Sequence, residues 1–276
     1  MADHGASSGE QRLGGGRSSA GVVRIGDTVH RPTGPWTPTI HAYLRHVRAA
    51  GFTAAPEVIG LDDRGREVLR YIPGHTWGDA IDPDEPKTDL PTIRPWPAAT
   101  RSDAALAATG RLLAELHRAA RGFRPASPIW REYEYPMRDD EIVCHTDTGP
   151  WNAVYRDGLP IALIDWDGAR PARPIDDFAD AAWDFVPLGP DDFLRDCGFV
   201  EPFDTARRLR IFCDAYGLAD RTSIVSALGL VRQLQPSKLR YWQPISPRIA
   251  AQHLRAAVRY LEWLDAKEDA FRAALK

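Results

Sequence analysis

The chain is poor in the features that mark secreted and membrane proteins. Its 276 residues contain three cysteines, too few for a disulfide framework in a chain of this length. Residues 1–6 include no apolar stretch of the kind found in a signal peptide. No run approaches the length of about 18 apolar residues that a transmembrane helix needs. We therefore expect a cytoplasmic protein with no membrane partner.

The chain also lacks an excess of basic charge. The formal net charge is -3, whereas binding to the phosphate backbone of nucleic acids requires a basic surface, so we expect no nucleic-acid partner. The imbalance is strongest between residues 138 and 204, where 16 Asp and Glu stand against 5 Arg and no Lys. We expect part of this excess to belong to a metal site and the rest to create a field that attracts a cationic molecule.

What the chain does contain is a set of polar residues at an informative spacing. His145, Asp147 and Asn152 fit the pattern H-x-D-x-x-x-x-N, which is typical of loops that catalyse phosphoryl transfer. In such a loop the aspartate receives the proton of the substrate hydroxyl and the asparagine holds a magnesium ion. The spacing therefore predicts a phosphoryl-transfer site around Asp147.

The residues after this loop bring a further carboxylate to the same place. Two strand-like segments, 153–156 and 159–164, flank Asp157 and Gly158, a dipeptide typical of tight hairpin turns. Arms of similar length return the chain to its starting end, so the hairpin predicts that Asp165 lies beside Asn152. A carboxylate and an amide oxygen are hard ligands that suit Mg²⁺.

Two further motifs follow in order, Ile164-Asp-Trp-Asp167 and Pro174-Ile-Asp-Asp-Phe-Ala179. Together with the segment from His145 to Asn152, they resemble the core of the aminoglycoside phosphotransferase family, a branch of the protein-kinase-like fold. That family typically shows H-x-D-x-x-x-x-N, then I-D-[WF]-[DE], then D-P-x-x-D-L-A. More diffuse similarity extends over most of residues 22–260.

The resemblance implies an α+β, two-lobed protein-kinase-like fold with a small β-rich N-lobe and a larger, mostly helical C-lobe. We expect a disordered tail at 1–16, where Gly, Ser and polar residues show no periodicity. The N-lobe, at 17–73, would bind the nucleotide, and the C-lobe, at 74–276, would hold the catalytic loop, the metal and the acceptor. Apolar residues at helical spacing predict the main C-lobe helices at 104–121, 205–216, 222–234 and 247–274.

The resemblance also assigns roles to the motif residues. Asp147 is the expected catalytic base, and Asn152 and Asp165 are the expected Mg²⁺ ligands. His145 is expected to support the geometry of the catalytic loop. Asp177, which matches the last aspartate of the family pattern, is expected to brace the loop through hydrogen bonds without touching the substrate.

The small lobe departs from the family pattern. Kinase-like folds use a strand lysine that pairs with the phosphates and with a helix glutamate, but strand 28–31 offers Arg31 or His30 instead. A guanidinium holds phosphate oxygens bidentately, so Arg31 is a sensible substitute, with His30 as the alternative. The next helix, expected at 39–50, contains no Glu, so the anchoring of Arg31 must differ from the usual ion pair. His41 is the only polar residue early in this helix that could face the site, and the alternative, which we favour, is that it lies on the helix surface.

Other nucleotide contacts follow from the resemblance alone. Leu69 and Tyr71 lie where the last small-lobe strand enters the hinge between the lobes, whose backbone groups contact the adenine of ATP in this family. GTP is the alternative nucleotide. The glycines at 14–21 either cover the phosphates or are simply flexible.

These observations predict an ATP-dependent phosphotransferase that modifies a hydroxyl of a small molecule. The acidic excess favours a cationic acceptor such as an aminoglycoside or an amino alcohol, and a macrolide, sugar or other neutral metabolite is the alternative. Two other classes are a non-catalytic nucleotide-binding module and a protein kinase. The short interval between Asp165 and Asp177 disfavours a protein kinase, because it leaves no room for a long activation segment.

Overall fold

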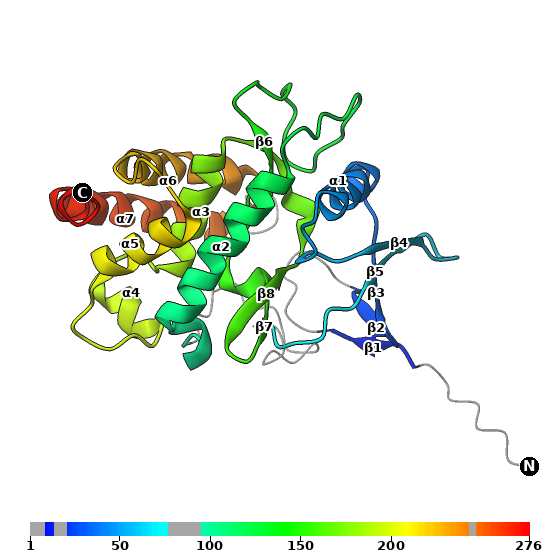
Figure 1. Cartoon of the computed structure of the whole chain (residues 1–276), viewed down its shortest axis with the longest axis horizontal. Helices are drawn as coiled ribbons and strands as arrows, with labels where there is room; N and C mark the ends of the chain where they lie inside the picture. Colours follow the sequence, from blue (N-terminus) through cyan, green and yellow to red (C-terminus); the bar gives the residue numbers. More distant parts are fainter. Residues whose placement is uncertain (1–8, 14–20, 77–94, 243–246) are drawn as a thin grey trace, which may run out of the picture.

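The computed structural model of the chain describes residues 9–13, 21–76, 95–242 and 247–276. A small β-rich lobe, formed by the N-terminal part, packs against a larger and mostly helical lobe (Figure 1). The strands and helix α1 of the small lobe are drawn in blue and cyan on one side of Figure 1, and the large-lobe helices lie on the other. The predicted α+β class with two lobes is confirmed.

The small lobe is built on a five-stranded antiparallel sheet with the order β1-β2-β3-β5-β4. Its strands are β1 (Gln11–Arg12), β2 (Val23–Ile25), β3 (Thr28–Arg31), β4 (Val58–Leu61) and β5 (Glu67–Arg70). Strand β3 runs beside β5 with Arg31 directly opposite Glu67. Opposed residues of an antiparallel pair project from the same face, so this register sets the two side chains next to each other.

The N-terminal segment corrects one prediction. Residues 1–16 are predicted to be disordered, but residues 9–13 lie against the sheet, where β1 pairs with the edge of β2. The carboxylate of Glu10 pairs with two arginines that follow β4. A strand edge distant in the sequence therefore orders this segment, and local composition does not reveal such a partner. The predicted glycine loop falls mostly on residues 14–20, which lie outside the described residues.

Helix α1 (Thr37–Ala49) connects the small lobe to the large one. It begins with Pro38 in its first turn, where the missing backbone N–H has no helical partner to lose. The helix predicted at 39–50 is confirmed. Its buried face includes Tyr43, whose hydroxyl donates to the backbone oxygen of Val143 in the large lobe at 2.7 Å. This buried bond fixes α1 on the large lobe.

The large lobe consists mainly of helices. They are α2 (Asp103–Ala119), α3 (Pro174–Phe185), α4 (Asp191–Asp196), α5 (Thr205–Tyr216), α6 (Ser223–Trp242) and α7 (Pro247–Ala274). The helices predicted at 104–121, 205–216 and 247–274 are confirmed. Helix α6 runs past its predicted end at residue 234, because it packs along α7. Within the described part of the chain, no helix has the length and apolar character needed to cross a bilayer.

Two short ladders flank the predicted catalytic loop and lie between the helices and the small lobe (Figure 1). They pair β6 (Ile142–Cys144) with β9 (Arg170–Ala172), and β7 (Ala153–Arg156) with β8 (Leu159–Leu163). The turn between β7 and β8 has positive φ at Asp157 (51°) and at Gly158 (79°), which is the combination of a type I′ turn. The predicted hairpin is confirmed.

The chain enters the large lobe along β7. The backbones of His75 and Tyr155 exchange two hydrogen bonds of 2.8 Å. A Cβ atom at Gly74 would lie 2.5 Å from a methyl of Val154 and 2.7 Å from the backbone oxygen of Tyr155. Glycine therefore permits an approach to β7 that any side chain would block.

Candidate active site

The catalytic loop leaves β6 in a strained conformation held by hydrogen bonds. Thr146 has a φ of 60°, which β-branched residues rarely adopt. Its backbone N–H donates to Asp177 Oδ1 at 2.7 Å, and its hydroxyl donates to the backbone oxygen of Gly168 at 2.7 Å. Such strain persists only where the surroundings over-determine it, and it is typical of functional sites. The loop is thus held in one shape.

Asp177 lies buried beneath the loop, in the first turn of α3. Its Oδ2 is 2.9 Å from His117 Nε2, and His117 Nδ1 is 2.7 Å from the hydroxyl of Tyr216. Burial alone would raise the pKa of Asp177, but the interactions with His117 and the Thr146 N–H outweigh it and lower the pKa. The charged carboxylate therefore ties the loop to α2, α3 and α5.

Asp147 and Asn152 face each other within the loop. The side-chain nitrogen of Asn152 donates to Asp147 Oδ2 at 2.8 Å and to the backbone oxygen of Asp147 at 2.9 Å. Both bonds use the amide nitrogen, so the amide oxygen is the atom that Asn152 can offer to a cation. Asn152 is buried, whereas Asp147 is exposed, as a group that meets an acceptor has to be.

The hairpin brings Asp165 back to Asn152. The N–H of Ile164 donates to the backbone oxygen of Asn152 at 2.9 Å. The buried ring of His145 lies with Nε2 2.9 Å from the backbone oxygen of Ile164, and its centroid is 4.5 Å from that of Trp166. Asp165 itself has a φ of 62°. His145 thus links the catalytic loop to the segment that carries Asp165.

Arg31 reaches into this cluster from β3. Its Nε lies 2.8 Å from Glu67 Oε1, its Nη1 lies 3.2 Å from Asp165 Oδ1, and its Nη2 contacts Asp167 Oδ2. Burial lowers the pKa of the guanidinium, but the three carboxylates outweigh it and raise the pKa above the usual arginine value. Arg31 therefore carries a permanent positive charge where the two lobes meet.

The two histidines of the small lobe have different positions. His30 follows the alternation of β3 to the opposite face from Arg31, where its Nδ1 pairs with Asp62 Oδ2 at 2.8 Å. His41, interpreted from the sequence as a surface residue, is instead buried, with Nε2 2.9 Å from Glu67 Oε2. That interpretation is wrong because α1 turns this side of the helix toward the sheet.

At the hinge, the backbone groups of both predicted nucleotide-binding residues are engaged. Leu69 is buried and pairs with strands on both sides, since β5 lies between β3 and β4. The N–H of Tyr71 donates to the backbone oxygen of Asp27 at 2.8 Å, and its ring packs under the guanidinium of Arg24 at 3.8 Å. The backbone of Leu69 and the N–H of Tyr71 are therefore already hydrogen-bonded within the small lobe.

Three residues of the cluster are absent from the predicted site. Glu67 is buried and holds Arg31, and Asp167 contacts Arg31 from the other side. Arg131, from the irregular segment before β6, lies with Nη1 3.6 Å from Asp167 Oδ2 and also packs 5.1 Å from the ring of Trp36. Asp167 belongs to the motif Ile164-Asp-Trp-Asp167, so the sequence did indicate a role for it. Glu67 and Arg131 gave no such indication, because only the fold brings them here.

Comparison with known proteins identifies the family of this chain. The phosphotransferase enzyme family matches residues 126–212, the segment that carries the catalytic loop, the hairpin and Asp177. A trifolitoxin immunity protein of Rhizobium leguminosarum bv. trifolii is 36% identical over 211 residues, which make up 75% of this chain and 73% of that protein. The chain belongs to the phosphotransferase enzyme family.

Solved structures show that this phosphotransferase has a kinase-like fold. A choline/ethanolamine kinase family protein from Mesorhizobium loti superposes with a TM-score of 0.59 at 18% identity, covering 98% of this chain and 94% of that one. An amicoumacin kinase superposes with a TM-score of 0.61 at 13% identity, covering 92% and 88%. Identities this low establish the fold alone. The predicted kinase-like fold and the family resemblance are confirmed.

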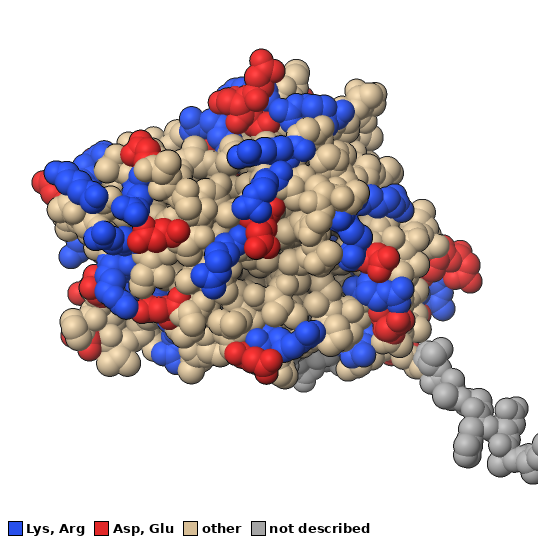
Figure 2. All heavy atoms as spheres, in the orientation of Figure 1, with Lys and Arg blue, Asp and Glu red and all other residues tan. Residues whose placement is uncertain are grey.

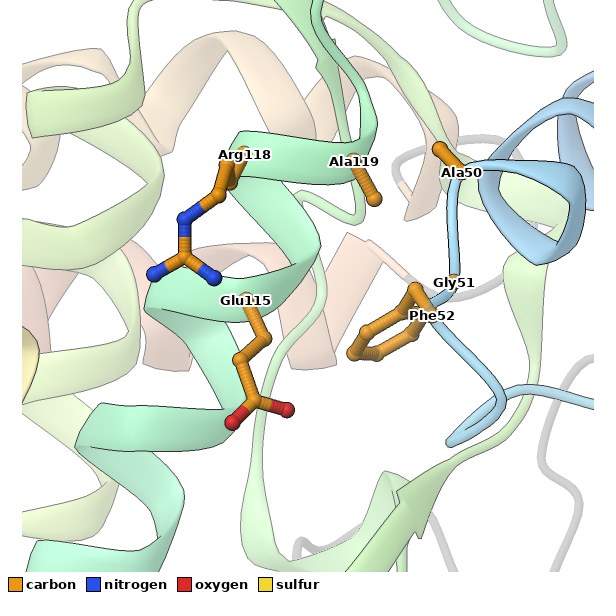
Figure 3. A pocket seen from close by; sticks show the side chains of 6 residues that line it. All are labelled: Ala50, Gly51, Phe52, Glu115, Arg118 and Ala119. Atoms are coloured by element: carbon orange, nitrogen blue, oxygen red, sulfur yellow. The ribbon is translucent and has the colours of Figure 1, made fainter.

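A hollow of about 210 Å³ lies apart from the catalytic cluster of the phosphotransferase, between the end of α1 and α2 (Figure 3). It is lined by residues 50–52 and by Glu115, Arg118 and Ala119. In Figure 3 the ring of Phe52 faces the carboxylate of Glu115 across the opening. None of these side chains belongs to the segment from His145 to Asp165 or to the cluster around Arg31, so the hollow is separate from the candidate active site.

Proposed function

We propose that this phosphotransferase moves the γ-phosphoryl group of ATP to a hydroxyl of a toxic small molecule and thereby inactivates it. One observation carries the proposal. The exposed carboxylate of Asp147 is hydrogen-bonded to Asn152, the backbone of Asn152 is hydrogen-bonded to Ile164 beside Asp165, and Asp165 pairs with Arg31, so these groups are connected at the boundary of the lobes. These groups are the ones that phosphoryl transfer to an alcohol requires.

Each group has a distinct task in the proposed reaction. The acceptor oxygen attacks the γ-phosphorus, the bond from phosphorus to the bridging oxygen of ADP breaks, and Asp147 receives the hydroxyl proton. Arg31 neutralises negative charge on the phosphate oxygens. The hydrogen bonds at Thr146 and Asp177 keep Asp147 in position, and positioning supplies much of the rate in this chemistry.

The donor set fits a magnesium ion. The amide oxygen of Asn152 and the carboxylate of Asp165 are hard oxygen ligands, and the Asp165 side chain is 30% exposed, so a hydrated ion reaches it. A bound Mg²⁺ would neutralise charge on the β- and γ-phosphate oxygens. With the ion bound, the carboxylate of Asp165 would lie between two positive charges, the ion and Arg31, and Asp167 would contact Arg31.

ATP is the proposed donor, and GTP is the alternative. The purine would be recognised by backbone groups at the hinge near Leu69 and Tyr71, where side-chain identity says little about the base. We place the reaction in the cytoplasm, because the three cysteines are all unpaired and buried, as is usual in a reducing compartment.

For the acceptor we propose a hydroxylated amine of the antibiotic type, such as an aminoglycoside or a smaller amino alcohol. The 36% identical relative is named for immunity to trifolitoxin, which supports a toxic acceptor. A neutral acceptor such as a macrolide or a sugar is the second candidate. Positive and negative side chains are intermixed over the face in Figure 2, and that face gives no support for a cationic acceptor.

A protein acceptor and a non-catalytic binding module are both disfavoured. The chain between Asp165 and α3 is occupied by a short helical turn (Trp166–Gly168) and by β9, which leaves no long activation segment. Nucleotide binding alone does not require the exposed carboxylate of Asp147, which is hydrogen-bonded to Asn152 and follows the strained Thr146.

The experiment is a turnover screen with the purified chain. ATP or GTP with Mg²⁺ is supplied together with a panel of aminoglycosides, amino alcohols, macrolides and sugars, and phosphorylated products are detected by mass spectrometry. We expect one phosphate on a hydroxyl of a cationic acceptor, formed about 10²-fold or more slowly by Asp147→Asn. Transfer to no acceptor in the panel, with nucleotide bound normally, would count against the proposal.

A further inference from the structure

We infer that Glu67 and His41 are positioning residues that aim the Arg31 guanidinium at the nucleotide phosphates. They would replace the helix glutamate that this small lobe lacks. The inference rests on the proposed function, because it takes Arg31 to be the phosphate-binding cation.

The inner and the terminal nitrogens of the Arg31 guanidinium have different partners. Its Nε is held by Glu67 Oε1 at 2.8 Å, on the neighbouring strand. Its Nη1 and Nη2 point the other way, toward Asp165 and Asp167 in the large lobe. A guanidinium is a planar fork, so fixing Nε from behind sets the direction of both terminal nitrogens. Without Glu67, the two carboxylates in front would be free to draw the charge away from the phosphates.

Glu67 is itself held by His41. The second oxygen of Glu67 lies 2.9 Å from His41 Nε2, and Glu67 and His41 are 3% and 6% exposed. A buried carboxylate is costly unless its oxygens are hydrogen-bonded. His41 therefore fixes which way Glu67 faces. It lies on α1, which the hydroxyl of Tyr43 ties to Val143 in the large lobe, so the position of α1 is transmitted to Arg31.

The same sheet contains a matched control. His30 also pairs with a carboxylate at 2.8 Å, that of Asp62, and both side chains are largely buried, at 12% and 10% exposure. This pair lies on the other face of β3 and has no contact with Arg31 among the described interactions. Removing either histidine removes a comparable bond from the small lobe, but only one of the two bonds leads to Arg31.

The test compares the affinities for Mg²⁺-ATP and for adenosine by calorimetry, using the full chain. Loss of phosphate contact should weaken ATP but not adenosine. We expect His41→Leu and Glu67→Gln to lower the preference for ATP by about tenfold, since hydrogen bonds to charged groups have this strength. His41→Gln, which keeps an N–H donor, should restore most of it, and His30→Leu should leave it unchanged. Equal losses in His41→Leu and His30→Leu would overturn the inference.

A double-mutant cycle separates positioning from a general structural role. In an Arg31→Ala background, His41→Leu should change the ATP-to-adenosine preference by less than about twofold, because its effect passes through Arg31. An additive loss in that background would overturn the inference. These measurements need no acceptor. If the cycle is non-additive as expected but no acceptor is phosphorylated, only the proposed function is rejected. If an acceptor is phosphorylated but the cycle is additive, only the positioning role is rejected.

Discussion

The large-lobe and small-lobe halves of the site are built differently. In the large lobe, Asp147, Asn152 and Asp165 belong to one short stretch of chain, which is held by tight turns, by hydrogen bonds within the stretch and by the buried Asp177 beneath it. In the small lobe, Arg31 is set by ion pairs among side chains from β3, β5 and the large lobe. The first half is therefore preorganised before any nucleotide binds. The second depends on charges that a nucleotide and its metal would redistribute.

Substitution of the proposed base should have the largest effect. Asp147→Asn keeps the shape of the side chain and removes the carboxylate that receives the proton. We expect kcat to fall by about 10²-fold or more while ATP affinity stays nearly unchanged, because the substitution acts on the transition state. Steady-state kinetics on an acceptor from the screen, with calorimetry for ATP, measures both quantities.

The comparison with Arg31→Ala sharpens this prediction. If the halves have separate tasks, Arg31→Ala should weaken ATP binding more than it lowers kcat, opposite to Asp147→Asn. Near-normal turnover by Asp147→Asn would remove Asp147 from the mechanism. Parallel losses of binding and kcat in both variants would mean that the two halves act as one unit.

The same difference explains what the sequence could predict. The loop, the hairpin and Asp165 follow from spacing and turn chemistry, and the helix α5 (Thr205–Tyr216) follows from the helical spacing of its apolar residues. Two members of the cluster around Arg31, Glu67 and Arg131, could not be predicted. Glu67 lies beside Arg31 only through the register of two strands, and Arg131 arrives from a segment without a pattern. Tertiary pairing of charges leaves no periodic signal in a single chain.

The stability of the large-lobe half should depend on Asp177. Its pKa is lowered in the folded protein, so its contribution is complete above the unfolded value of about 4 and is lost as the pH falls through that value toward the folded one. We expect Asp177→Asn to cost about 2–3 kcal/mol of unfolding free energy near pH 7. Its stability should also fall less steeply than that of the wild type between about pH 5 and pH 3.

Asp176→Asn is the control for this prediction. Asp176 is the neighbouring carboxylate and forms two hydrogen bonds with Arg173, at 2.8 and 2.7 Å, but both side chains are partly exposed, so we expect its substitution to cost less than that of the buried Asp177. Denaturant unfolding of the three proteins at several pH values provides the measurement. Equal losses in both variants, or an unchanged acid limb in Asp177→Asn, would show that the loop is not braced in this way.

Asp165, which connects the two halves of the site, should make ATP binding depend on the metal. Asp165 contacts Arg31 and is the proposed ligand of Mg²⁺, so Asp165→Ala should abolish most of the Mg²⁺ dependence of ATP binding, about tenfold or more. Asn152→Ala should cost less, because it removes a neutral ligand. Calorimetry with and without Mg²⁺ measures this order. Binding of equal strength with and without the ion in all three proteins would contradict the metal assignment.

The smallest expected effect concerns the acceptor and its charge. The excess of acidic residues between 138 and 204 would steer a cation toward the enzyme, but part of it is paired, as Asp192 is with Arg259 and Glu201 is with Arg195. We therefore expect only a few-fold rise in KM for a cationic acceptor as the salt increases, with kcat nearly constant, since exposed charges are screened over about 8 Å at physiological ionic strength. A neutral acceptor tested in parallel should show no such rise. If the best acceptor is neutral, or if its KM is indifferent to salt, the acidic residues serve only the surface and the metal site, and the proposed cationic acceptor is wrong.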